Sequence, residues 1–110
     1  MAKVSYREAR ELLAKRETFV GNSMSARYHS TFCPDYGRLY SEEYARLRAD
    51  FARSQELGVP LYVVYSYNTP IAWALPNELA YVVEQKFSVT TSKGQGYVRA
   101  YIDGRIEAFV

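Results

Sequence analysis

The chain has 110 residues, of which 48% are hydrophobic and 24% are charged, a composition that suits one folded domain and argues against a disordered chain. Fourteen Lys and Arg against 12 Asp and Glu give a net charge of +2, too close to balance to indicate nucleic-acid binding by itself. The single cysteine, Cys33, excludes an internal disulfide, and one Cys with one His argues against a structural zinc site. We expect no cofactor.

The N-terminus and the apolar stretches indicate the cellular compartment of the protein. The first sixteen residues are charged and lack the apolar core of a signal peptide. The longest apolar stretches, Val59–Tyr65 and Ile71–Leu75, are far shorter than the roughly 20 residues that span a bilayer. An unpaired cysteine fits a reducing compartment. We therefore expect a soluble protein of the cytoplasm.

A first helix is predicted over Tyr6–Arg16. Ser5 and Glu8 have the spacing of a capping box, in which each side chain accepts a hydrogen bond from the other residue's backbone N–H. Val4 and Ala9 occupy the two positions of a hydrophobic staple. An apolar stripe at helical spacing follows, made by Tyr6, Ala9, Leu12 and Leu13.

Residues 18–40 give a weaker signal. Thr18–Val20 fits a short strand, and Gly21-Asn22 fits a turn. Ser23 to Tyr40 is polar and aromatic, with no periodicity that we identify, so we expect a long loop there. Loops of that length are usually functional or mobile.

A second helix is predicted over residues 42–56. Ser41 can serve as its N-cap, and Glu42 and Glu43 suit the positive end of the helix dipole. Gly58 fits the left-handed position that follows a helix. One apolar face is formed by Tyr44, Leu47 and Phe51.

The second half of the chain predicts an antiparallel meander. The expected strands are Pro60–Tyr67, Ile71–Leu75, Leu79–Val83 and a possible fourth at Lys86–Thr90, with turns at residues 68–70 and 76–78. A third helix would start at Ser92, with Gln95 completing its capping box, and residues 105–110 could add an edge strand. The predicted fold is a single α+β domain over residues 1–110, a three- to four-stranded β-meander with about three helices packed on one face.

Three segments carry a resemblance to known proteins. They are FVGNSMSA at Phe19–Ala26, YSYNTPIAW at Tyr65–Trp73 and QKFSVTTSKGQGYVRAY at Gln85–Tyr101. This pattern resembles an uncharacterised family of small accessory proteins from bacteriophages of actinobacteria, whose members more often have His where this chain has Gly94. The resemblance implies a phage origin and a non-virion role in the host cell. It implies no activity and no catalytic residues.

The first candidate site lies in the long loop. Arg and aromatic residues together are typical of protein-binding hot spots and also of surfaces that stack nucleic-acid bases. Mixed charge, from Asp35, Glu42 and Glu43 nearby, favours a protein partner over a polyanion. The alternative is a loop packed by its own aromatic side chains. The candidate partner-binding residues are Arg27, Tyr28, Tyr36, Arg38 and Tyr40.

A second candidate is an anion site at the start of the third helix, made by Thr90, Thr91, Ser92 and Lys93. Helix N-termini bind anions through unpaired N–H groups, so this site could hold a phosphate, a nucleotide or nucleic acid. Helix capping alone also explains these residues. The P-loop pattern is absent.

Three further features have weaker functional interpretations. A cysteine nucleophile would need a base and an orienting group, which His29, Cys33 and Asp35 could provide, but their closeness in one loop argues against it. Trp73 is expected in the core. The apolar end Ile106–Val110 could support a homo-oligomer.

We therefore expect a non-enzymatic protein that binds a host or defence protein, with nucleic-acid or nucleotide binding as the alternative.

Overall fold

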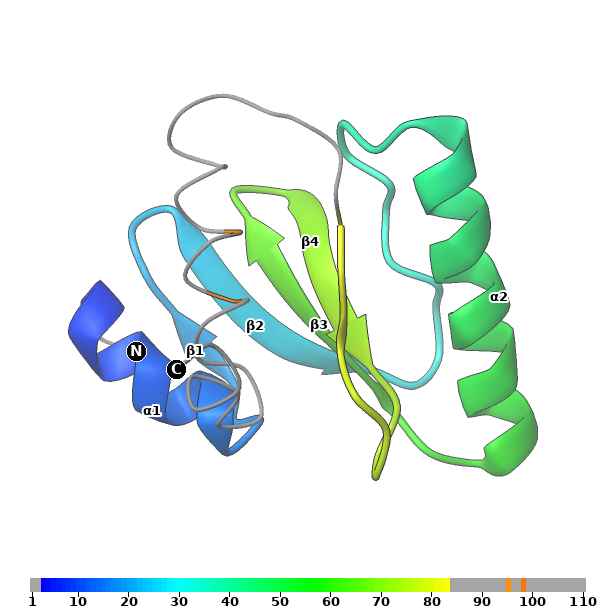
Figure 1. The fold of residues 1–110 in the computed structure, drawn as a ribbon, viewed down its shortest axis with the longest axis horizontal. Helices are drawn as coiled ribbons and strands as arrows, with labels where there is room; N and C mark the ends of the chain where they lie inside the picture. Colours follow the sequence, from blue (N-terminus) through cyan, green and yellow to red (C-terminus); the bar gives the residue numbers. More distant parts are fainter. Residues whose placement is uncertain (1–2, 84–94, 96–97, 99–110) are drawn as a thin grey trace.

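A computed structural model gives the fold and describes residues 3–83, 95 and 98 (Figure 1). Within those residues the chain is an α+β domain, which confirms the predicted fold class. Two helices and five strands follow in the order α1 (Tyr6–Ala14), β1 (Phe19–Val20), β2 (Met24–His29), α2 (Ser41–Leu57), β3 (Leu61–Ser66), β4 (Thr69–Ala74) and β5 (Tyr81–Val82).

Helix α1 begins as predicted and ends earlier. The Ser5 hydroxyl accepts from the Glu8 backbone N–H at 3.2 Å, and the Glu8 carboxylate accepts from the Ser5 N–H, so the capping box is confirmed. The helix stops at Ala14 because Arg16 turns into the left-handed region, at φ 54°. The Arg16 and Glu17 N–H groups then donate to the Leu13 and Leu12 carbonyls.

The five strands form one antiparallel sheet in the order β1-β2-β3-β4-β5. Strand β2 pairs with β3 along its full length, from Met24 beside Ser66 to His29 beside Leu61. The expectation of a structureless loop from residue 23 is therefore wrong for residues 24–29. The segment alternates after all, because Met24, Ala26 and Tyr28 share one face while the polar residues between them share the other.

Both faces of the sheet are covered, which corrects the prediction that the helices pack on one face. Every residue of β3 and β4 is buried, so each face needs apolar cover. Ala9 and Leu13 of α1 pack on the face that carries Tyr62 and Val64. On the other face α2 contributes its predicted apolar side, Tyr44, Leu47 and Phe51, against Leu61, Val63 and Tyr65. Figure 1 shows α1 and α2 on opposite sides of the sheet.

Helix α2 starts one residue before the predicted point. Tyr40 is the N-cap, so Ser41 is already helical, and no side-chain hydrogen bond caps this end. Glu42 and Glu43 occupy the first turn, as expected from the helix dipole. The helix ends at Gly58, whose φ of 68° is the left-handed conformation that glycine adopts without strain.

The β3–β4 turn is shifted from its predicted place. It consists of Tyr67 and Asn68, and the strand resumes at Thr69 rather than after Pro70. Pro70 has no N–H to donate, and the pairing register shifts beside it, between Val64 and Tyr65 of β3. Tyr67 has a left-handed φ of 54°.

The last elements are described in part. Strand β5 pairs with Ala72 and Trp73 and is shorter than the predicted Leu79–Val83. Gln95 and Val98 are helical and buried, and Gln95 Nε2 donates to the Val83 carbonyl at 2.7 Å. The predicted strand Lys86–Thr90, the rest of the third helix and residues 105–110 lie outside the described residues.

Candidate functional site

The loop between β2 and α2 is anchored to the β3–β4 turn through Gly37. Its φ is 56°, and an added Cβ would lie 2.7 Å from Thr69 Cα and 2.8 Å from the Asn68 carbonyl oxygen. The next residue, Arg38, donates its backbone N–H to Thr69 Oγ1 at 3.0 Å. Only glycine permits this close approach, so residues 36–40 are held against one end of the sheet.

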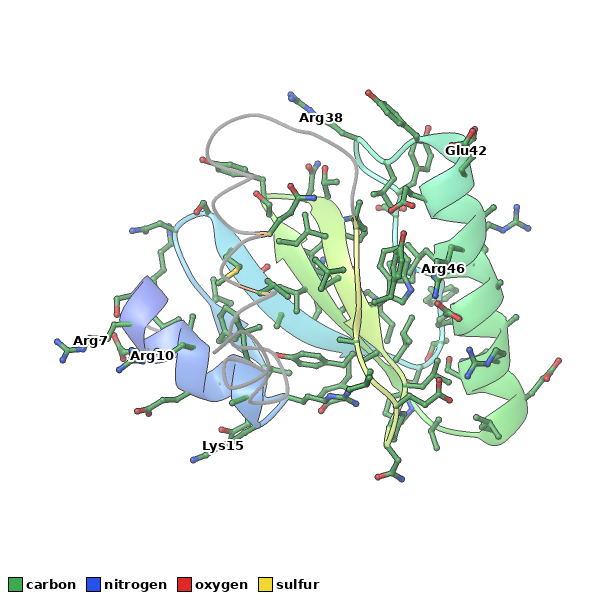
Figure 2. The ribbon with its side chains drawn as sticks, in the orientation of Figure 1. Arg7, Arg10, Lys15, Arg38, Glu42 and Arg46 are labelled. Atoms are coloured by element: carbon green, nitrogen blue, oxygen red, sulfur yellow. The ribbon has the colours of Figure 1, made fainter. Side chains whose placement is uncertain are left out.

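We call the surface formed at that end by Tyr36, Arg38, Tyr40 and Tyr67 the tyrosine end. Three of the predicted partner-binding residues belong to it. Tyr36, Tyr40 and Tyr67 are 55%, 63% and 64% exposed. Tyr36 leans on Tyr44 of α2, with ring centroids 5.0 Å apart. Figure 2 shows Arg38 and Glu42 beside the start of α2.

Tyr67 is the member that sequence analysis missed, because it was assigned to the strand. Left-handed φ costs a residue with a side chain roughly 1–2 kcal/mol, and bulky residues rarely adopt it. Tyr67 donates its backbone N–H to the Ser23 carbonyl at 2.7 Å, which holds the turn, but the ring itself is mostly in solvent. The tyrosine side chain therefore does not repay the strain by burial.

The other two predicted partner-binding residues separate across the sheet, since neighbours in a strand point to opposite faces. Tyr28 lies on the α1 face, with its ring centroid 5.0 Å from that of Tyr62. Arg27 lies on the α2 face, where its guanidinium sits 4.6 Å from the ring centroid of Tyr65. The five predicted residues thus do not form one continuous surface.

The predicted cysteine–histidine group is brought near Tyr65 without forming a reactive pair. His29 Nε2 and the Tyr65 hydroxyl are 2.5 Å apart. Burial, and then the charge of Arg27, lower the pKa of His29. Burial raises the pKa of Cys33, against a smaller opposing effect of Arg48. Among the described residues no hydrogen bond joins Cys33 to His29. A protonated thiol without a base is a weak nucleophile, so this geometry does not favour the chemistry.

Trp73 lies in the core, as predicted, with 1% of its surface exposed. Its indole N–H donates to Asp50 Oδ2 at 2.8 Å, and its ring centroid is 5.2 Å from that of Tyr81. The other carboxylate oxygen of Asp50 accepts from Arg53 at 3.1 Å. These contacts attach α2 to the sheet and keep the Trp73 side chain buried between them.

The alternative anion site, Thr90, Thr91, Ser92 and Lys93, lies outside the described residues, and so does the predicted oligomerisation segment Ile106–Val110. Neither of the two described helices is long and apolar enough to cross a membrane.

Together these features define a small α+β domain with a helix on each face of an antiparallel sheet and an exposed tyrosine-rich end. The chain belongs to the Family of unknown function (DUF8033), whose sequence model matches residues 7–105. Comparisons with curated proteins and with solved structures found no match. The family match says nothing of a phage origin.

Proposed function

We propose that this protein is a non-enzymatic binding module that engages another protein through the tyrosine end. The observation that carries the proposal is the left-handed, exposed Tyr67. Backbone strain that the fold does not need is concentrated at functional positions. Asparagine or glycine would make the same turn with less strain, so the tyrosine ring is the reason for this residue type.

The chemistry of the surface suits a protein partner. Tyrosine offers a large rigid ring and a hydroxyl with little entropy to lose on binding, and Tyr and Arg dominate binding hot spots. The charge at the tyrosine end is mixed, because Arg38 lies beside the acidic start of α2, where Glu42 is exposed. A polyanion would be repelled by that carboxylate, whereas a protein surface can match both signs.

We also propose where the protein acts. The resemblance to phage accessory proteins implies a protein made inside a host cell, so the partner we propose is a host or defence protein of the cytoplasm. Binding there would act by covering a surface of that partner.

Capture from cell lysate tests the choice of partner class. Tagged protein is incubated with lysate, with and without nuclease, and the bound material is identified by mass. We expect one discrete protein, retained after nuclease, that the double variant Tyr36→Ser/Tyr40→Ser fails to hold. Arg7→Ala, on the outer side of α1, is the matched control and should capture normally (Figure 2). Material that disappears with nuclease would move the assignment to nucleic acid.

A second test separates binding from folding at Tyr67. Tyr67→Asn should relieve about 1 kcal/mol of strain and raise the melting temperature. The same variant should weaken binding to the captured partner about tenfold, as expected for loss of a hot-spot side chain. A variant that is more stable and binds as well as the original protein would contradict the assignment.

A further inference from the structure

A cavity of about 570 Å³ lies at the other end of the sheet from the tyrosine end. Its walls are the C-terminal end of α1, the ends of β2, β3 and β4, and the β4–β5 loop. We call it the α1 cleft. Its volume falls within the range of roughly 300–1,000 Å³ that is typical of small-molecule sites.

The floor of the α1 cleft follows from strand register. Tyr28, Tyr62 and Ala74 are cross-strand partners on three adjacent strands, and all three line the cleft. The side chain of Ala74 is small, so it leaves space in the cleft beside Tyr62. Tyr62 is buried, while Tyr28 remains 43% exposed and presents its ring to the cleft.

Both tyrosine rings are fixed in place. The Tyr28 hydroxyl donates to the Arg16 carbonyl at 2.5 Å, and the Tyr62 hydroxyl donates to the Glu17 carbonyl at 2.8 Å. The two ring centroids are 5.0 Å apart with the planes tilted by 53°. A ligand ring that stacks on Tyr28 therefore meets a surface that is ordered before binding, which reduces the entropic cost.

Arg16 fixes the separation of the two walls. Its Nη1 donates to the Leu75 carbonyl at 2.8 Å, and its Nη2 donates to the Glu78 carbonyl. This bridge joins the end of α1 to a loop in which Asn77 also has a left-handed φ, of 64°. The open space between α1 and the loop is thus maintained by the fold.

The residues that line the cleft carry a net positive charge. Lys15 and Arg16 line it from α1. The one acidic residue in its described lining, Glu78, is already paired, since both of its carboxylate oxygens accept from Arg53 Nη2, at 2.7 and 2.6 Å. Glu17 lies outside the lining, although its charge acts on Tyr28, so an anionic group at the mouth would meet mainly the cations Lys15 and Arg16.

We propose that the α1 cleft binds a small planar aromatic molecule that carries an anionic group. The aromatic part stacks on Tyr28, and the anionic part is attracted by Lys15 at the edge. A mononucleotide and an aromatic carboxylate share this chemistry. The site is separate from the tyrosine end, so it stands or falls independently of the proposed partner binding.

Amide chemical-shift titrations of the full chain test the ligand class. The probes are adenosine monophosphate, 2-naphthoate, adenosine and inorganic phosphate. We expect adenosine monophosphate or 2-naphthoate to shift the amide signals of Lys15, Arg16, Asn77 and Leu79. The probe that binds more tightly shows whether the ligand is a mononucleotide or an aromatic carboxylate. Adenosine and phosphate, each lacking one half of the ligand, should bind more weakly.

Two variants and a control test the assigned contacts. Tyr28→Leu should weaken the tighter probe about tenfold, the loss expected for one stacking contact. Lys15→Gln changes an exposed side chain that the fold does not need. It should weaken binding of the tighter probe about three- to fivefold and leave the affinity for adenosine unchanged. Arg7→Gln, which is exposed on α1 and does not line the cleft, should bind as the original protein does. Absence of cleft shifts with every probe, or equal binding by original protein and Lys15→Gln, would overturn the proposal.

Discussion

Asp50 of α2 accepts a 2.8 Å hydrogen bond from the indole N–H of Trp73, the residue before the last in β4. The two residues are 23 positions apart in the chain, and the bond is one of the polar links between α2 and the sheet, beside the bond from the Tyr81 hydroxyl to Glu43. Arg46 and Arg53 flank the carboxylate, at 3.9 and 3.1 Å. Asp50 thereby helps to set the rotation of α2 over the sheet, because a buried indole N–H needs an acceptor in one direction.

Substitution of Asp50 should show how much this acceptor contributes. Asp50→Ala leaves the buried Trp73 N–H unpaired and should cost about 1–3 kcal/mol of unfolding free energy. Asp50→Asn keeps a carbonyl acceptor and should cost less. Urea unfolding followed by fluorescence of Trp73, the single tryptophan of the chain, measures both. Equal losses for the two variants would mean that charge, rather than the acceptor, stabilises the contact.

At Arg16 strain and bonding can be separated. Arg16→Ala keeps the left-handed strain and loses the bonds to the Leu75 and Glu78 carbonyls, so we expect a loss of about 1–3 kcal/mol. Arg16→Gly loses the same bonds but relieves about 1 kcal/mol of strain. Glycine should therefore be the more stable of the two in chemical denaturation. A ranking of alanine above glycine would show that the left-handed conformation is not retained in the variants.

The chain offers a matched pair of glycines with left-handed φ. At Gly58 an added Cβ meets nothing within 4 Å, so Gly58→Ala should cost only the conformational strain, about 1 kcal/mol. At Gly37 the Cβ would overlap Thr69 and Asn68, so Gly37→Ala should cost a further 1–3 kcal/mol, approximately. Thermal unfolding of both variants gives the comparison. Similar melting temperatures would indicate that the 36–40 segment moves away from the β3–β4 turn.

Stability should depend on pH through His29. Burial and Arg27 lower the folded pKa of His29 below the ordinary value of 6.5. A backbone hydrogen bond with Phe32 and then the charge of Asp35 oppose this shift, and the Tyr65 hydroxyl contacts the ring. The unfolded chain thus takes up a proton first as the pH falls. The contribution of neutral His29 to the free energy of unfolding is fully present above about pH 6.5, the pKa in the unfolded chain. It is lost as the pH falls from there toward the pKa of His29 in the folded protein. Unfolding at pH 7.5, 6.5 and 5.5 should show a steeper decline for the original protein than for His29→Asn. Parallel declines would assign the effect to other groups.

Local patterns predicted the helices and the meander because their signals are short-range. The Ser5–Glu8 capping box and the Gly58 stop act within a few residues, and both are observed. Strand β2 was missed although Met24, Ala26 and Tyr28 alternate with polar residues. The polar residues of β2 lie on a face of the sheet that α2 covers, where Arg27 and His29 contact Tyr65. The strand therefore does not follow the usual pattern of polar residues toward solvent and apolar residues toward the core, by which strands are recognised in a sequence.

The candidate sites were less accessible to sequence analysis. Tyr36, Arg38 and Tyr40 could be named because Arg and Tyr cluster in one segment. Their neighbour Tyr67 comes from the β3–β4 turn, and the link between them is the close approach of Gly37, which only the fold supplies. The α1 cleft likewise depends on Arg16 reaching Leu75, 59 residues away. Left-handed φ at a tyrosine or an arginine has no compositional signal.

The pairing of β2 with β3 also bears on the order in which the molecule assembles. Strands β3 and β4 are joined by a two-residue turn, whereas the pairing of His29 with Leu61 joins residues that are separated in the sequence by the whole of α2. Contacts between distant residues form late because the closure entropy must be overcome first. Ala26→Gly and Ala72→Gly alter two buried alanines on the same face, and we expect the first mainly to speed unfolding and the second to slow folding as well. The β1–β2 hairpin, which pairs with β3 last, would then complete the sheet.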